Sequence, residues 1–221
     1  MEKRERTKNQ KNLIFGIFML VLFVVWTVLV KMVDVEPIGP NGSSVGFATL
    51  NGFVHELLGV HMALYDITDW LSIIPLLFIF AFAVLGVVQL VKRKSIFKVD
   101  NSILILGGFY AVVMAVFVMF EFLAVNYRPV LINGVLEASY PSSTTLLVMC
   151  VLPTTVMQLK SRIKNQMCGN AVAVFLYIFT VFMVTARLIS GVHWFTDIIG
   201  GAVFSAGLVM IYYSLTKLCA K

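Results

Sequence analysis

The sequence reads LIFGIFMLVLFVVWTVLVKMVD from residue 13 to residue 34. A run of about 20 apolar residues is long enough to cross the hydrocarbon core of a bilayer as an α-helix. Five further apolar runs follow, near residues 70–91, 102–124, 145–159, 171–189 and 198–216. The sequence therefore predicts an all-α integral membrane protein, a bundle of six transmembrane helices.

The overall composition supports the same class. Of 221 residues, 60% are hydrophobic and 13% are charged, whereas about a quarter of the residues of a soluble domain are charged. A soluble domain and a disordered chain are both excluded by this ratio. Six spans and their connectors use almost the whole length, so residues 1–221 are expected to form a single membrane domain.

The net charge of +6 is unevenly distributed. Basic residues gather in four segments at alternate ends of the predicted spans: residues 3–11, 92–98, 160–164 and 217–221. Such a bias is typical of cytoplasmic segments of membrane proteins. We therefore expect residues 1–12 to be a basic cytoplasmic tail, both termini to be cytoplasmic, and no nucleic-acid partner to be needed.

Two long connectors fall on the opposite, outward side. The first, residues 35–69, contains a stretch from Phe47 to Tyr65 that is expected to form a short interfacial helix, with His55 and His61 on it. The second, residues 126–144, is richer in groups that bind anions. Because functional residues concentrate in loops held by a rigid scaffold, the function is sought there.

The second connector predicts a phosphate site. It begins with Arg128-Pro129 and ends with Pro141 followed by Ser142, Ser143 and Thr144 at the start of the fourth span. An Arg side chain presents a fork of donors to a phosphate, and a helix start leaves backbone N–H groups free to bind it. Pro-Ser-Ser-Thr is also a good helix cap without any ligand, and that alternative stays open at this point.

A third stretch, ARLISGVHWFTD at residues 186–197, joins the fifth and sixth spans. His193 and Asp197 are four residues apart, so on a helix they share a face and the carboxylate can orient the imidazole. The other ring nitrogen is then free to act as a nucleophile. Arg187 can bind a phosphoryl oxygen beside it. An interfacial His with a capping Asp is the alternative, and the adjoining Arg favours the catalytic interpretation.

These residues resemble the type-2 phosphatidic acid phosphatase superfamily, which is related to vanadium haloperoxidases. The family's third motif matches at Arg187, His193 and Asp197, with Ala186 in place of Ser. The first motif matches at Arg128-Pro129, but Glu121 stands at its Lys position. The second matches at Pro141-Ser142, but Ser143 and Thr144 replace its Gly and its general-acid His.

The resemblance implies a six-helix bundle in the cell membrane with an active site that faces outward. It implies that His193 attacks a lipid phosphate and forms a phosphohistidine, that Asp197 orients His193, and that the substrate phosphate is bound by Arg128, Arg187, Ser142, Ser143 and Thr144. It implies neither a cofactor nor a metal. The partners are then the lipid substrate and the surrounding membrane lipids.

The departures from the motifs leave three functions open. The first is a lipid phosphate or diphosphate phosphatase. The second is a phosphotransferase that moves a head group between lipids, and the third is a non-catalytic lipid-binding relative. Because Thr144 cannot donate a proton as His does, we expect polyprenyl diphosphate to be preferred to phosphatidate. If phosphatidate is preferred, the proton must come from another group, such as His55, His61 or Glu121.

Overall fold

The computed structural model describes residues 2–219. These residues form eight α-helices, and two short 3₁₀ turns lie at Pro40–Gly42 and Ile96–Lys98. The helices are α1 (Glu2–Met32), α2 (Ala48–Leu58), α3 (Met62–Leu71), α4 (Ile73–Arg93), α5 (Asn101–Leu123), α6 (Ser143–Lys160), α7 (Gln166–Ile189) and α8 (Phe195–Leu218). The predicted all-α class is confirmed.

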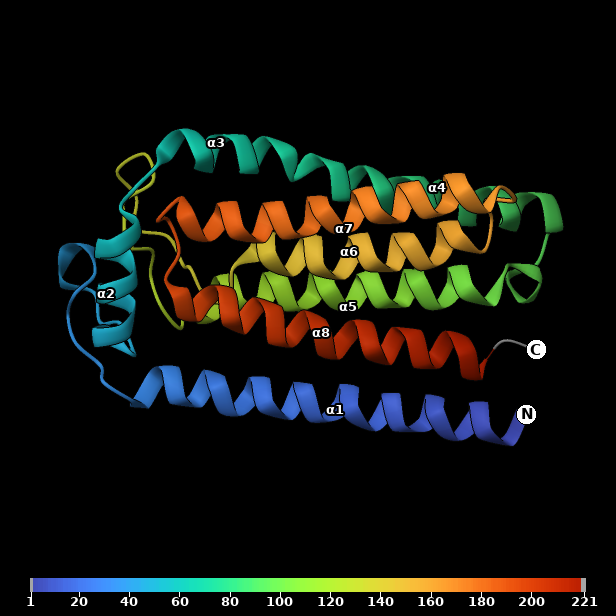
Figure 1. The fold of residues 1–221 in the computed structure, drawn as a ribbon, viewed down its shortest axis with the longest axis horizontal. Helices are drawn as coiled ribbons and strands as arrows, with labels where there is room; N and C mark the ends of the chain where they lie inside the picture. The colour runs from blue at the N-terminus through green and yellow to red at the C-terminus, as the bar shows by residue number, and fades with distance from the viewer. Residues whose placement is uncertain (1, 220–221) are drawn as a thin grey trace.

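The long helices run side by side along one axis, and α2 crosses one end of the bundle (Figure 1). Helix α6 lies among the others and contacts α4, α5, α7 and α8. Helix α1 packs along α8, and Gly16 and Gly207 face one another in this contact. The approach is close: a Cβ added to Gly16 would lie 2.9 Å from the Gly207 carbonyl oxygen. Both ends of the chain lie at the end of the bundle opposite α2 (Figure 1).

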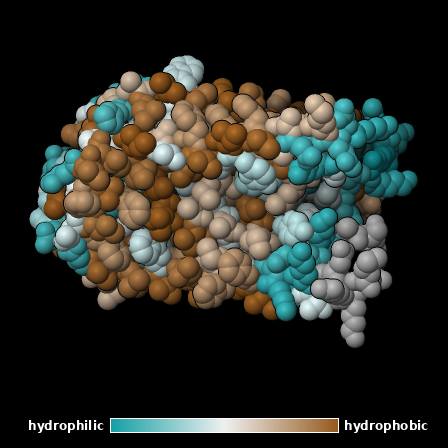
Figure 2. All heavy atoms as spheres, viewed as in Figure 1, coloured by the Kyte–Doolittle hydropathy of each residue, from teal (hydrophilic) through white to brown (hydrophobic). Residues whose placement is uncertain are grey.

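Apolar side chains cover the middle of the molecule, and hydrophilic ones gather at the end where the chain begins and ends (Figure 2). Within the described residues, five helical segments are long and apolar enough to cross a membrane: Arg6–Met32, Met62–Arg93, Asn101–Leu123, Gln166–Ile189 and Phe195–Leu218. The protein is therefore a multi-pass membrane protein.

The predicted fourth span, residues 145–159, forms α6 but is not among those five segments. Helix α6 carries polar residues such as Thr154, Thr155 and Gln158, all of which are buried. A helix that is enclosed by its neighbours has little contact with lipid, so it does not need the continuous apolar surface of a lipid-facing span. The count of six membrane spans stays a prediction.

The first outward connector differs from its prediction. Instead of one helix over residues 47–65, the chain forms α2, breaks at residues 59–61, and continues as α3, which is followed directly by α4. Gly59 in this break has φ +69°, a conformation that L side chains rarely adopt. Residues 62–69 therefore belong to the long helical segment Met62–Arg93 and not to a loop.

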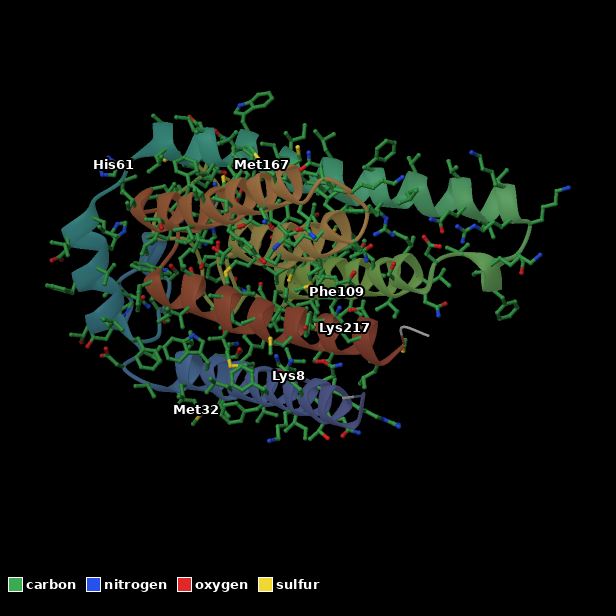
Figure 3. All side chains as sticks on the ribbon, turned by 45° about the vertical axis from the view of Figure 1, so that its right-hand side comes forward. Lys8, Met32, His61, Phe109, Met167 and Lys217 are labelled. Atoms are coloured by element: carbon green, nitrogen blue, oxygen red, sulfur yellow. The ribbon has the colours of Figure 1, made fainter. Side chains whose placement is uncertain are left out.

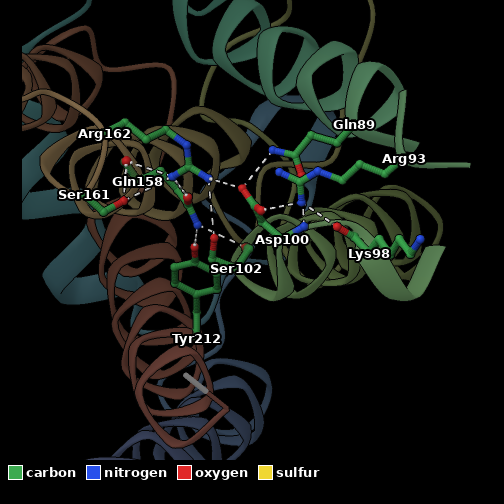
Figure 4. Close-up of polar contacts among 9 residues, drawn as sticks. All are labelled: Gln89, Arg93, Lys98, Asp100, Ser102, Gln158, Ser161, Arg162 and Tyr212. Carbon is green, nitrogen blue, oxygen red and sulfur yellow. Dashed lines mark hydrogen bonds and ion pairs between the residues drawn. The ribbon is translucent and has the colours of Figure 1, made fainter. Parts of the chain in front are cut away.

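A polar cluster joins four helices at the end away from α2 (Figure 4). The Asp100 carboxylate accepts hydrogen bonds from Arg93 Nη1 at 2.8 Å and Gln89 Nε2 at 2.8 Å. Gln158 on α6 donates to the Ser102 carbonyl oxygen at 3.0 Å and also to the Tyr212 hydroxyl. This cluster fixes the ends of α4, α5, α6 and α8 relative to one another.

The labelled side chains show which residues share each end of the bundle (Figure 3). Lys8 on α1 and Lys217 on α8 lie together, whereas His61 lies at the far end, beside the α2–α3 link. The connectors between α5 and α6 and between α7 and α8 lie at the His61 end (Figure 1). All three predicted motifs therefore meet at one end of the molecule.

Candidate active site

A tight turn, residues 190–194, carries His193 between α7 and α8. The Ser190 hydroxyl donates to the Arg187 carbonyl oxygen at 2.7 Å and closes the end of α7. Gly191 has φ +69°, and a Cβ there would lie 2.1 Å from the Gly59 carbonyl oxygen. The α2–α3 link is thus packed directly against the turn, and only glycine is compatible with both the backbone conformation and the close approach.

Hydrogen bonds fix the orientation of the His193 ring. Nδ1 lies 3.0 Å from the Ser139 carbonyl oxygen, and Nε2 lies 3.3 Å from Arg128 Nη1. A carbonyl oxygen only accepts, so Nδ1 carries the proton and Nε2 carries the lone pair. The nitrogen that can attack a phosphorus atom therefore points toward the Arg128 guanidinium.

The surroundings of His193 keep its imidazole neutral. Only 3% of the residue is exposed. Burial, together with the positive charges of Arg128 and Arg187, lowers the pKa of His193 well below its ordinary value of 6.5. A neutral imidazole is the nucleophilic form, so the site holds His193 ready to react at neutral pH.

Asp197 lies next to the same ring, but it is not the closest acceptor. Its Oδ2 is 3.7 Å from His193 Nδ1 and accepts a hydrogen bond from the Trp194 backbone N–H at 3.0 Å. Its Oδ1 accepts from Asn126 Nδ2 at 3.4 Å. The predicted pairing thus differs in one respect: the Ser139 carbonyl oxygen holds the ring, and the Asp197 carboxyl group lies farther from it, with Oδ2 at 3.7 Å from Nδ1.

Arg187 is buried and held on several sides by α3. Its Nη1 donates to Thr68 Oγ1 at 3.0 Å and to the Tyr65 carbonyl oxygen at 3.3 Å. Its Nη2 lies 3.5 Å from Asp69 Oδ1, and the guanidinium carbon is 4.5 Å from the centre of the Tyr65 ring. These contacts fix the position of the guanidinium before any ligand binds.

Arg128 is the second cation and lies on the connector between α5 and α6. Its Nε is 3.0 Å from Glu137 Oε2, and its backbone N–H donates to the Glu137 carbonyl oxygen at 3.0 Å. The guanidinium carbon also lies 5.8 Å from the centre of the Tyr65 ring. Tyr65 therefore contacts both cations and helps to hold them near one another.

The three predicted anion-binding residues at the start of α6 have two different roles. Ser142 is the N-cap: its hydroxyl oxygen accepts from Thr145, and its backbone N–H donates to the Asp197 carbonyl oxygen at 3.1 Å. Its N–H group is therefore engaged within the protein. Ser143 and Thr144 follow in the first turn, where backbone N–H groups have no acceptor within the helix, and both line the pocket described next.

A pocket of about 370 Å³ is lined by several of these groups. Its polar end is formed by Asp69, Glu121, Arg128, Ser143, Thr144 and Arg187, and its apolar walls come from α4, α5 and α6 through Leu76, Val113, Met114, Phe117, Leu146 and Leu147. Two cations among the lining residues of a largely apolar pocket suit a phosphate group attached to a hydrocarbon chain.

A second, much smaller cavity of about 10 Å³ lies against His193. Glu121, Phe117, Ser143 and Leu146 line both cavities, so the two spaces are neighbours. Of the predicted site residues, Arg128, Arg187, Ser143 and Thr144 line the larger pocket and His193 lines the smaller one. Ser142 and Asp197 support the site from behind.

The two other histidines do not line either cavity. The His55 ring packs on Trp194, with 5.4 Å between ring centres, and burial lowers its pKa. His61 Nε2 lies 2.9 Å from the Leu58 carbonyl oxygen, and its backbone N–H donates to the Ser190 carbonyl oxygen at 3.0 Å. Both histidines thus pack around the His193 turn and are not directed at the substrate pocket.

Sequence reasoning missed the residues that hold the predicted ones. Ser139 orients His193 through its carbonyl group, and Asn126 contacts Asp197. Tyr65 and Thr68 hold Arg187 from a helix more than 100 positions away along the chain. Backbone carbonyls and partners at such distances leave no pattern in a single sequence.

Comparisons with known proteins find a family match in sequence and a likeness in fold. Residues 121–220 match the model of the PAP2 superfamily. The fold is similar to that of the crystal structure of the first transmembrane PAP2 type phosphatidylglycerolphosphate phosphatase from Bacillus subtilis, with a TM-score of 0.60, 17% identity, and coverage of 90% of this chain and 94% of that chain.

At 17% identity this likeness is one of fold. No curated protein matches the chain in sequence. The resemblance predicted from the three motifs is nevertheless confirmed, because all three lie within residues 121–220, the part of this chain that matches the model of the PAP2 superfamily.

Proposed function

We propose that this protein is a membrane lipid phosphatase in which His193 is the nucleophile. The observation that carries the proposal is the position of His193 Nε2: it carries the ring's lone pair, it lies 3.3 Å from Arg128 Nη1, and His193 lines a small cavity next to the apolar-walled pocket. The match to the model of the PAP2 superfamily and the similarity in fold to a PAP2-type lipid phosphatase support the same class of activity.

In the proposed reaction the lipid lies with its chain along the apolar walls and its phosphate at the polar end. Nε2 of His193 forms a bond to phosphorus while the bond between phosphorus and the leaving oxygen breaks. Arg128, Arg187 and the N–H groups at the start of α6 neutralise the charge on the phosphoryl oxygens. The Ser139 carbonyl and the Asp197 carboxylate stabilise the positive charge that develops on the ring.

The absence of His at position 144 favours a lipid diphosphate as the substrate. Phosphatidate must expel an alkoxide, for which a general acid is worth about 10²- to 10⁴-fold in rate. A polyprenyl diphosphate expels a phosphate monoester, which is already a stable anion. The two arginines and the helix N–H groups are then sufficient, and Thr144 need donate no proton.

The proposed location is the cell membrane, with the active site facing outward. The basic segments 92–98 and 160–164 lie at the end of the bundle opposite the His193 turn, and a basic excess favours the cytoplasmic side. The substrate phosphate would then be hydrolysed at the outer leaflet.

Phosphate release by the purified protein tests this function. We expect kcat/KM to be higher for a polyprenyl diphosphate than for phosphatidate, and Thr144→His to shift the ratio toward phosphatidate. The matched inactive control is His193→Ala. Faster hydrolysis of phosphatidate by the unmodified protein would contradict the diphosphate preference, and no release from any lipid phosphate would contradict the phosphatase.

An acceptor lipid belongs in the same assay, because an alcohol can replace water in attacking a phosphohistidine. Release that depends on an added lipid alcohol, with the phosphoryl group recovered on that alcohol, would identify a head-group phosphotransferase. Lipid binding with neither release nor transfer would identify a non-catalytic relative.

A further inference from the structure

Glu121 occupies a position that the proposed reaction has not used. It lies in the last turn of α5, is exposed, and lines both the cavity at His193 and the larger substrate pocket. Within residues 2–219, its carboxylate makes no ion pair or hydrogen bond with the protein. A carboxylate beside a phosphate site raises the energy of the bound anion, so its presence there needs an explanation.

The other carboxylates around the site are already engaged. Asp69 lies 3.5 Å from Arg187 Nη2, and Glu137 lies 3.0 Å from Arg128 Nε. Asp197 accepts hydrogen bonds from the Trp194 N–H and from Asn126. Two described carboxylates line the substrate pocket, Asp69 and Glu121, and Glu121 is the one that forms no ion pair.

The second half of the reaction requires a proton acceptor. A phosphohistidine is hydrolysed by a water molecule, which must lose a proton as its oxygen bonds to phosphorus. In-line displacement brings this water from the side opposite Nε2, the side that the departed leaving group has just vacated. In the proposed binding mode that side is the substrate pocket, and Glu121 is one of the residues that line this pocket. The hydroxyl groups of Ser143 and Thr144 are too weakly basic at neutral pH to take the proton.

We propose that Glu121 is the general base that activates water for hydrolysis of the phosphohistidine, an inference that rests on the proposed function. In this step the Glu121 carboxylate takes one proton from water, the water oxygen bonds to phosphorus, and the bond between phosphorus and His193 Nε2 breaks. The products are inorganic phosphate, neutral His193 and protonated Glu121, which then releases its proton to solvent.

This role agrees with the preference for diphosphates. A general base must be ionised when the water attacks, and an ionised carboxylate has no proton to give to a leaving group in the first step. Glu121 therefore assists hydrolysis of the phosphohistidine but not its formation. The phosphohistidine then forms fast only from substrates that have a good leaving group. A Lys at this position, which the family motif would supply, is a cation at neutral pH and cannot serve as this base.

The test is Glu121→Gln, which keeps the size of the side chain and removes the base. With a polyprenyl diphosphate whose terminal phosphorus is ³²P-labelled, we expect the first turnover to stay fast and the steady state to slow by about 10²- to 10⁴-fold. Labelled phosphoenzyme should then accumulate. KM should not rise, because the variant removes a negative charge from the pocket.

Chemical rescue separates a base from a merely structural residue. Hydroxylamine is a better nucleophile than water and needs no base, so it should restore turnover in Glu121→Gln but not in His193→Ala. The matched control is Glu56→Gln, since Glu56 is an exposed carboxylate on α2 that lines neither cavity. We expect this control to behave as the unmodified protein does.

Three results would overturn the role of Glu121: a normal steady-state rate in Glu121→Gln, a slowed rate without phosphoenzyme, or slowed turnover that hydroxylamine does not restore. If Glu121→Gln fails to fold, Glu121→Asp provides the test, because Asp keeps a carboxylate but has a shorter side chain. Full activity of Glu121→Asp would also contradict the proposal. Each of these results is read against an unmodified protein that releases phosphate. If the unmodified protein itself releases no phosphate, the proposed function is wrong, and the role of Glu121 is not the cause.

Discussion

The tautomer of His193 follows from one backbone carbonyl. The Ser139 oxygen lies 3.0 Å from Nδ1, so the proton stays on that nitrogen and the lone pair of Nε2 faces Arg128. The tautomer is therefore selected by the connector between α5 and α6, whereas His193 itself lies between α7 and α8. Two segments far apart in the sequence must fold together before the histidine can act.

The protonation state of His193 can be measured directly. Because its pKa lies well below 6.5, ¹⁵N-histidine spectra recorded from pH 8 to pH 5 should show a ring that stays neutral at pH values where an ordinary histidine takes up a proton. The His193 signal is assigned by its absence in His193→Ala. Titration of this signal near pH 6.5 would contradict the account.

Stability should depend on pH with a definite sign. A histidine whose pKa is lowered in the folded state binds its proton first in the unfolded chain. Its contribution therefore favours the folded state fully above pH 6.5, the ordinary pKa of histidine, and is lost progressively as the pH falls below that value. The Tm of the unmodified protein should consequently fall more between pH 7 and pH 5 than that of His193→Ala.

At the scale of single residues, sequence patterns predicted the site residues better than the groups that hold them in place. The spacing of Arg187, His193 and Asp197 predicted that these side chains lie together, because i, i+4 pairs share a helix face. The carbonyl that orients His193 could not be predicted, since every residue has a carbonyl and only the fold selects one. Ser142 was predicted to bind phosphate, but its N–H group donates to the Asp197 carbonyl oxygen.

At the scale of elements, the turn that carries His193 depends on its contact with the α2–α3 link. Gly191→Ala would place a Cβ 2.1 Å from the Gly59 carbonyl oxygen, in addition to a strained φ of +69°. Gly59→Ala is the matched control, because its φ is also +69° but nothing lies within 4 Å of the added Cβ. The pair separates a steric clash from backbone strain alone.

We expect Gly59→Ala to lower the free energy of unfolding by about 1 kcal/mol and to leave kcat nearly unchanged. Gly191→Ala should destabilise the protein further and should lower kcat at least 10-fold, because displacement of the turn moves His193 Nε2 away from Arg128. Thermal unfolding and phosphate release measure the two effects. Equal behaviour of the two variants would mean that the contact does not position the turn.

The apolar pattern of the sequence predicts the long helices but not every helix boundary. All six apolar runs form helices, because a long apolar run in a membrane protein satisfies its backbone only by folding as a helix. The region before the second span was less predictable: residues 66–69, which contain Asp66 and Asp69, were expected to follow the interfacial helix as part of the connector, yet they lie within α3. Asp69 is compatible with that helix because Arg187 lies 3.5 Å from its carboxylate.

At the scale of the whole molecule, the two ends of the bundle differ in function. One end gathers the site, and the other gathers most of the basic residues and the Asp100 cluster (Figures 1 and 4). Arg93 and Gln89 donate hydrogen bonds to Asp100 and lower the pKa of its carboxyl group. The end away from the site is thus fixed by polar contacts.

The orientation in the membrane is a prediction of the charge distribution. In intact cells, a cysteine at Asn133 should react with a membrane-impermeant maleimide, and a cysteine at Lys94 should react only after the membrane is permeabilised. The background should lack Cys168 and Cys219, which are exposed. Labelling of the Lys94 position alone in intact cells would reverse the proposed orientation of the active site.

The most direct measurement of the central claim is a search for phosphoryl transfer to His193. The protein is mixed with a polyprenyl diphosphate labelled with ³²P at its terminal phosphorus, quenched in base, and digested for mass spectrometry. We predict an acid-labile, base-stable phosphoryl group on His193 of the unmodified protein and neither phosphoenzyme nor turnover in His193→Ala. Turnover that survives in His193→Ala, or a phosphoryl group found on another residue, would contradict the account.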